Sequence, residues 1–112
     1  MPHKSFQLAA DQIKPVATGY GSCFATDRIT VDGAEVGYCY REEPNVTDSG
    51  WRFFAGDESD AYTSDPDNFA LYDVNTIANY DPSITVLLEA APGSVFERDE
   101  SGHFIPVVSR EA

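Results

Sequence analysis

The sequence predicts an α+β fold: a small, mostly antiparallel sheet with two short helices between the central strands and a C-terminal hairpin. Three patterns indicate this class: apolar alternation between residues 22 and 55, helical spacing of apolar residues near residue 84, and a turn sequence near residue 100. The chain has 112 residues, the size of one domain, and 42% of them are hydrophobic, which suffices for one modest core. We expect residues 1–21 to form an N-terminal segment and residues 22–112 to form a single α+β domain.

Apolar runs on either side of Asp32-Gly33 predict a hairpin. The runs are Ile29–Val31 and Ala34–Arg41, and Asp-Gly between two such runs is a strong signal for a hairpin turn. A further strand is expected over Ser22–Thr26, directly before them. The first part of the sheet is therefore predicted to be antiparallel.

Alternation along these strands selects the residues expected in the core. The apolar face of the second hairpin strand consists of Val36, Tyr38 and Tyr40. A third strand over residues 51–55 places Trp51 and Phe53 on one side. Because large aromatic residues on the strands of a small sheet are usually buried, we expect Tyr38, Trp51 and Phe53 to pack in the core.

Capping residues predict two short helices in the second half of the chain. Asp73 precedes Val74–Asn79, and Asp81 with Pro82 begins a second helix. The apolar face of this second helix consists of Ile84, Leu87 and Leu88. Residues 57–68, which come before both helices, show no periodic apolar pattern and are expected to form a solvated acidic loop.

The end of the chain is typical of a hairpin. Ser94–Arg98 and His103–Val108 flank the polar turn Asp99–Gly102. Pro106 has no backbone N–H to donate, so the last strand is expected at an edge of the sheet. At the other end of the chain, a short helical turn is expected near Gln7–Ile13.

The charge of the chain restricts the classes of partner. Asp and Glu total 19 against 7 Lys and Arg, which gives a net charge of −12. Such a surface repels nucleic acid phosphates and anionic lipid headgroups and attracts basic proteins. We expect a basic protein partner, and neither nucleic acid nor a membrane. An alternative that stays open is that the excess carboxylates only keep a small protein soluble.

Targeting signals are not evident in the sequence. The N-terminus contains no apolar stretch of signal-peptide length, and the longest apolar run, at Ile84–Leu88, is too short to span a bilayer. We therefore expect a cytoplasmic protein in which Cys23 and Cys39, both on predicted strands, are reduced and buried.

Spacing argues against a metal site. The soft metal ligands of the chain are Cys23, Cys39, His3 and His103. None of them lie at the close pair spacing of a structural zinc site. A calcium-binding EF-hand loop begun at Asp65 would place Ala70 and Thr76 where Gly and Glu are required. We expect no metal, no cofactor and no catalytic residue.

Four blocks of sequence resemble one known family. They are Ala25–Ile29, Val36–Glu42, Asp48–Glu58 and Gly93–Arg98. In this order they are similar to the bacterial immunity protein 33 family, and the resemblance spans about residues 22–98. It implies a small intracellular antidote of a polymorphic toxin system, which binds its toxin and blocks it. Cys39 stands where the family pattern has Met, a change of similar volume that leaves the expected fold intact.

Charge and resemblance together predict a non-enzymatic immunity protein that binds a toxin through an acidic surface. The residues expected at the contact are Asp57, Glu58, Asp60, Asp65, Asp67 and Arg41. The alternative is a small-ligand-binding or hydrolytic domain with a cleft between the sheet and the helix at Ile84–Glu89. A self-associating module is a third reading, and the sequence leaves the oligomeric state open.

Overall fold

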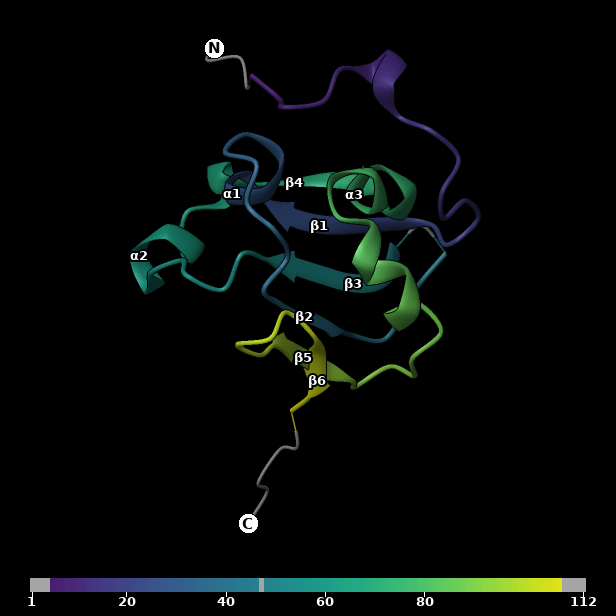
Figure 1. Cartoon of the computed structure of the whole chain (residues 1–112), viewed down its shortest axis with the longest axis vertical. Helices are drawn as coiled ribbons and strands as arrows, with labels where there is room; N and C mark the ends of the chain where they lie inside the picture. Colours follow the sequence, from purple (N-terminus) through teal and green to yellow (C-terminus); the bar gives the residue numbers. More distant parts are fainter. Residues whose placement is uncertain (1–4, 47, 108–112) are drawn as a thin grey trace.

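The computed structural model describes residues 5–46 and 48–107, which form one sheet with short helices around it (Figure 1). The strands are β1 (Ser22–Thr26), β2 (Tyr38–Arg41), β3 (Asp48–Phe54), β4 (Phe69–Asp73), β5 (Val95–Arg98) and β6 (Phe104–Pro106). The α-helices are α1 (Asp27–Thr30), α2 (Asp60–Thr63) and α3 (Val74–Tyr80), and the 3₁₀ helices are η1 (Ala10–Gln12), η2 (Pro66–Asn68) and η3 (Pro82–Leu87). The fold class is α+β, as predicted.

The sheet is mixed, which corrects the prediction of a mostly antiparallel one. The strand order is β4-β1-β3-β2-β5-β6, and β1 runs parallel to β3 while the other neighbouring pairs in the described residues are antiparallel. After β1 the chain forms β2 two positions away in the sheet, running in the opposite direction to β1. β3 then occupies the position between them and pairs antiparallel with β2, so it runs parallel to β1.

The hairpin predicted around Asp32-Gly33 is wrong. Ile29 belongs to the short helix α1 and is fully buried. The N–H of Gly33 donates to the carbonyl of Ile29 (3.1 Å), and Gly33 has a φ of +80°. A glycine with positive φ directly after a helix is a common helix end. Asp-Gly therefore closes a helix here, and Ala34–Gly37 is a loop that leads into β2.

Strand β3 buries the face that alternation predicted, whereas β2 buries the opposite one. Trp51 and Phe53 of β3 are fully buried, as predicted. Cys39 pairs with Phe53 and is also fully buried, whereas Tyr38 pairs with Phe54 and is only half-buried. Residues paired across strands point to the same side of a sheet, so the prediction that Tyr38 lies in the core is wrong.

The two predicted helices of the second half are confirmed in position, and they follow the central strands and precede the C-terminal hairpin. Asp73 caps α3 by accepting from the N–H of Asn75 (2.8 Å). Asp81 caps the second helix by accepting from the N–H of Ser83 (3.1 Å), but this helix is 3₁₀. Its apolar residues pack against the inner face of the sheet, where Ile84 is fully buried.

Residues 57–68 were predicted to be loop, and part of this segment is helical. It contains α2 and η2, each one turn long. Ser59 caps α2 with its hydroxyl, which accepts from the N–H of Tyr62 (3.1 Å). One-turn helices leave no apolar period to detect, so only their caps mark them. The edge strand β4 that follows was not predicted.

The two ends of the described chain agree with the sequence. β5 and β6 form the C-terminal hairpin, and Pro106 lies in the edge strand β6. The expected end of that strand at Val108 lies outside the described residues. The 3₁₀ turn η1 lies inside the helical turn expected at Gln7–Ile13. Asn79 of α3 accepts from the N–H of Lys14 (2.8 Å) and thereby anchors this segment.

Both thiols are free and buried, as predicted. Burial raises the pKa of the Cys23 thiol far above its ordinary value and the pKa of Cys39 to about 12. Both side chains therefore remain uncharged near neutral pH and pack as small apolar groups.

Gly50 and Gly93 allow a matched test of packing, because both have a φ of +94°. A Cβ on Gly50 would lie 2.1 Å from the carbonyl oxygen of Glu42, whereas one on Gly93 meets nothing within 4 Å. Gly93→Ala is expected to lower the free energy of unfolding by about 1–2 kcal/mol, the cost of the backbone conformation. Gly50→Ala adds an overpacking cost of about 1–3 kcal/mol. Urea unfolding measures both, and equal losses would contradict the predicted clash.

Candidate partner-binding surface

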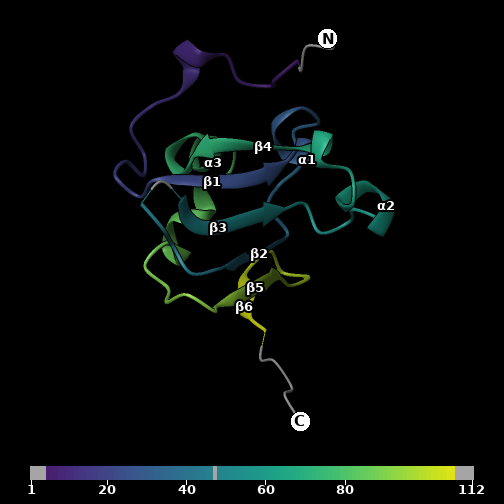
Figure 2. The same ribbon diagram turned by 180° about the vertical axis from the view of Figure 1, so that it is seen from behind.

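The outer face of the sheet carries an aromatic cluster. Residues paired across strands share a face, and the pairs of Phe54 with Tyr38 and of Phe24 with Arg52 define the side opposite the core. We call five residues of this side the aromatic face: Phe24, Tyr38, Tyr40, Phe54 and Phe69. Figure 2 shows the sheet from this side, with α3 behind it. In the described residues no helix covers the aromatic face.

The rings of the aromatic face pack on one another. The centroid of Phe54 lies 5.6 Å from that of Tyr38, 5.8 Å from that of Tyr40 and 5.8 Å from that of Phe69. All four side chains are half-buried, so one part of each ring rests on its neighbours and the other part is open to solvent. Rings fixed in this way lose little conformational entropy when a partner covers them.

Arg52 lies among these rings and is held by carboxylates. Its guanidinium carbon is 4.8 Å from the centroid of Phe24, and its nitrogens contact Asp48 (2.9 Å) and Glu42 (3.4 Å). The hydrogen bond from Arg52 lowers the pKa of the Asp48 carboxyl below its ordinary value. Arg52 is therefore neutralised within the chain and adds no free positive charge to this face.

Two of the predicted acidic residues are used inside the chain. Asp57 makes a two-pronged contact with Arg28 (3.0 and 2.7 Å), and Arg28 lowers the pKa of the Asp57 carboxyl. Glu58 accepts from the hydroxyl of Thr26 (2.7 Å) and from the N–H groups of Ala55 (2.7 Å) and Gly56 (2.9 Å). The Glu58 carboxylate thus holds the turn after β3 against β1.

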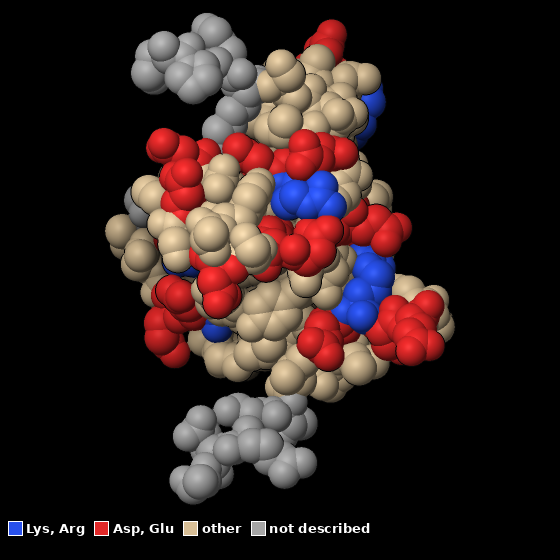
Figure 3. Space-filling model, turned by 90° about the vertical axis from the view of Figure 1, so that its left-hand side faces the viewer, with Lys and Arg blue, Asp and Glu red and all other residues tan. Residues whose placement is uncertain are grey.

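The other three acidic residues are Asp60 on α2, Asp67 on η2 and Asp65 directly before η2. Asp65 caps η2 by accepting from the N–H of Asp67 (2.9 Å). Asp60 and Asp67 lie in the first turns of α2 and η2 and are exposed. Figure 3 shows the side of the molecule on which α2 lies, where red carboxylates outnumber blue cationic groups. We call the five residues Asp57, Glu58, Asp60, Asp65 and Asp67 the acidic end.

Arg41 is separated from the acidic end. Arg41 of β2 pairs with Trp51 of β3, whereas the acidic end follows Phe54, the last residue of β3. Its guanidinium donates to the carbonyls of Ser49 (2.9 Å) and Ala90 (2.8 Å) and lies 5.8 Å from the Trp51 ring centroid. Arg41 therefore connects β2 to the segment after η3.

Two open hollows lie where the acidic end meets the aromatic face. The first, of about 610 Å³, has acidic walls and aromatic side chains within it, and we call it the acidic hollow. Its charged and aromatic lining residues are Asp57, Glu58, Asp60, Glu97, Arg98, Tyr38 and Phe54. The second, of about 760 Å³, is the apolar hollow, lined among others by Phe24, Tyr40, Phe54, Pro66 and Phe69. Phe54 and Thr63 line both hollows.

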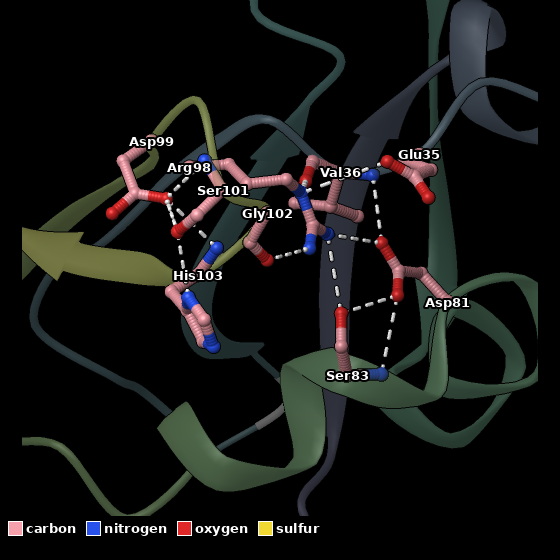
Figure 4. Close-up of polar contacts among 9 residues, drawn as sticks. All are labelled: Glu35, Val36, Asp81, Ser83, Arg98, Asp99, Ser101, Gly102 and His103. Atoms are coloured by element: carbon pink, nitrogen blue, oxygen red, sulfur yellow. Dashed lines mark hydrogen bonds and ion pairs between the residues drawn. The ribbon is translucent and has the colours of Figure 1, made fainter.

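A buried ion pair holds the hairpin beside the acidic hollow (Figure 4). A terminal nitrogen of Arg98 donates to Asp81 (2.6 Å), and the two side chains are only 14% and 9% exposed. Arg98 also donates to the carbonyls of Val36 (2.9 Å) and Gly102 (2.9 Å). Asp81 in turn accepts from the N–H of Val36 (2.9 Å). The pair joins β5, the loop before β2 and the start of η3.

The hairpin turn also brings together Asp99, Ser101 and His103, the residue types of a hydrolytic triad. The hydroxyl of Ser101 donates to Asp99 (2.7 Å) and lies 2.7 Å from Nδ1 of His103. In a triad the imidazole lies between the hydroxyl and the carboxylate and removes the hydroxyl proton. Here the hydroxyl lies in the middle and its proton points to the carboxylate, so the group stabilises an exposed turn.

Within residues 5–46 and 48–107, no group of three or more His, Cys, Asp and Glu side chains is placed to hold a metal ion. In the same part of the chain, no helix is long and apolar enough to cross a membrane.

The fold and these surfaces define a small α+β domain with an acidic end and an aromatic sheet face. A family model described as the Immunity protein Imm33 domain matches residues 23–108. The chain belongs to this family, as the resemblance of its sequence predicted. No curated protein and no solved structure matches the chain.

The aromatic face was missed in the sequence because the tyrosines of β2 were assigned to the core. A signal was nevertheless present in β3, where Arg52 alternates with the buried Trp51 and Phe53. An arginine in the middle of a strand usually marks the solvent side, and the tyrosines of the paired strand share that side.

The buried pair of Arg98 and Asp81 is expected to contribute more to stability than an exposed ion pair does. Arg98→Met leaves Asp81 buried without its cation, and the free energy of unfolding is expected to fall by about 3–5 kcal/mol. Arg28→Met is the control, because it breaks an exposed pair with Asp57 and is expected to change stability little. Urea unfolding compares the two, and similar losses would show that burial does not distinguish them.

The ion pair of Asp48 and Arg52 is expected to make stability depend on pH. Because Arg52 lowers the folded-state pKa of Asp48, the stability that Asp48 contributes is present above its unfolded pKa of about 3.9 and is lost as pH falls through the lower folded value. Asp48→Asn is expected to cost about 1 kcal/mol at pH 7. The difference from the parent should shrink below about pH 4. Urea midpoints from pH 7 to pH 2 measure it, and a constant difference would contradict the assignment.

Proposed function

We propose that this chain is a non-enzymatic immunity protein that binds a partner toxin and blocks it through the acidic end. The membership of the chain in the immunity protein family carries the proposal. The net charge of −12 supports a basic partner, because a surface of one sign accelerates the encounter with the opposite sign.

The structure suggests which carboxylates contribute most to the contact. Asp57 is neutralised by Arg28, and Glu58 is occupied by the turn that it holds. Asp60 and Asp67 are exposed in the first turns of their helices. We therefore propose that Asp60 and Asp67 meet cationic groups of the toxin directly, whereas Asp57, Glu58 and Asp65 shape the surface that carries them.

Arg41 was also predicted at the contact, and its place in the fold supports a different role. Its donors reach Ser49 and Ala90 within the chain, at the far end of β3 from Asp60. We propose that Arg41 contributes to folding and that the toxin contacts the acidic end without it.

The rival function, a ligand-binding or hydrolytic cleft between the sheet and the second helix, finds less support. Ile84 and Leu88 of that helical segment are buried in the core against the sheet. The two hollows described above lie on the opposite face. A protein partner, which needs a broad surface, fits this arrangement better than a small molecule does.

Charge reversal tests the proposal. The partner is first isolated by affinity capture from a lysate of the source bacterium at low salt, eluted with salt and identified by mass spectrometry. Its toxicity is measured as growth inhibition in cells that express it alone. The Asp60→Lys, Asp67→Lys double variant is expected to bind the purified partner at least tenfold more weakly and to lose protection of growing cells.

Glu43→Lys is the matched control. Glu43 is exposed in the loop between β2 and β3, at the opposite end of β3 from Asp60, and its reversal makes the same change of charge per substitution, half that of the double variant. It is expected to retain protection. Full protection by the double variant would overturn the assignment of the acidic end, and a captured partner without toxicity would overturn the immunity function itself.

A further inference from the structure

We infer that the aromatic face is the apolar centre of the interface and that it receives a protein partner with apolar side chains ringed by Lys and Arg. The inference rests on the proposed function for the identity of the partner as a toxin. It assigns to the contact a second surface, the outer face of the sheet, which adjoins the acidic end.

The composition of the aromatic face is typical of the centre of a protein interface. It presents tyrosine and phenylalanine rings around Arg52, and aromatic residues and arginine are enriched in the centres of protein interfaces. Leu71 and Ile105 extend the same side of the sheet and are 55% and 41% exposed. Leu71 pairs with Phe24 and extends the aromatic face onto β4, whereas Glu97, which pairs with both Tyr38 and Ile105, interrupts the apolar surface on β5. Exposed apolar surface of this kind marks binding sites.

The charge around the aromatic face favours a basic protein over a second copy of this chain as the partner. Asp60 and Asp67 lie on one side of it, Glu42 and Asp48 at the other end of β3, and Glu97 on β5. A second copy of this chain would bring the same carboxylates into opposition, because a two-fold interface places each patch against itself. Like charges across an interface are costly. A basic partner instead meets the opposite charge of Asp60, Asp67 and Glu97, while Asp48 and Glu42 remain paired with Arg52.

The two hollows indicate which side chains the partner is expected to present. A cationic side chain in the acidic hollow would lie between the carboxylates of Asp60 and Glu97 and the rings of Tyr38 and Phe54. Ion pairing and cation–π attraction act together in such a site. The apolar hollow beside it, bounded by Tyr40 and Phe69, suits an aliphatic or aromatic side chain. The partner is therefore expected to present a cationic residue next to an apolar one.

Photo-crosslinking in living cells tests the inference. The photoreactive amino acid p-benzoylphenylalanine replaces Tyr40 or Phe54 in the full chain, and Val86 in the control. Val86 is 81% exposed on η3, which packs on the inner face of the sheet. Irradiation of the source bacterium is expected to give the same adduct with one basic protein from positions 40 and 54, and none from position 86.

A substitution that spares the core supplies the second measurement. Leu71→Lys places a charge on the aromatic side of the sheet, and Val86→Lys makes the same change on the other side. The crosslinked protein, once purified, is expected to bind the Leu71→Lys variant at least tenfold more weakly than the parent and the Val86→Lys variant equally well. Circular dichroism during thermal unfolding checks that both variants are folded.

The outcomes separate the two proposals. No adduct from positions 40 and 54, an adduct with a second copy of this chain, or unchanged affinity of Leu71→Lys would each overturn the inference. A different outcome is an adduct from positions 40 and 54 with a protein that binds Leu71→Lys more weakly but does not inhibit growth. It would support this interface and overturn the immunity function. Growth protection that survives loss of the aromatic contact would leave the immunity function in place without this surface.

Discussion

The arrangement of the sheet depends on the buried pair of Arg98 and Asp81. Each side chain also bonds to backbone groups, so the pair connects β5, the loop before β2 and the junction of α3 with η3. A buried ion pair stabilises only when its remaining donors and acceptors are satisfied, and here Val36, Ser83 and Gly102 satisfy them. The pair thus anchors β5 to the loop before β2, next to the register in which Tyr38 pairs with Glu97 and Cys39 with Phe96.

That register gives the sheet its two unlike faces. Cys39 points inward to Trp51 and Phe53, and α3 and η3 close this side. The tyrosines on either side of Cys39 point outward and join Phe54 in the aromatic face. A sheet with one covered face usually shows polar residues on the other. Aromatic residues on the open face therefore call for an explanation by function, and a partner protein supplies one.

The acidic residues divide between folding and surface charge. Asp73 and Asp81 cap helices, Glu58 holds a turn, and Asp48 restrains Arg52. Carboxylates used in this way need a fixed geometry and tolerate little change. Exposed carboxylates such as Asp60 contribute charge without such constraints, and they are the ones free to adapt to a basic partner. The same residue type thus serves both stability and recognition, and burial and bonding decide which.

The sequence by itself determined the α+β class, β1, the caps at Asp73 and Asp81, the C-terminal hairpin, the burial of Trp51 and Phe53, and the family. These features depend on local spacing, on capping chemistry or on blocks of sequence, all of which are visible in one chain. The tertiary structure alone decided that β3 inserts beside β1, that Asp32-Gly33 ends a helix, and that Tyr38 and Tyr40 face outward. Alternation gives two possible faces for every strand, and only pairing with neighbours distant in sequence selects one of them.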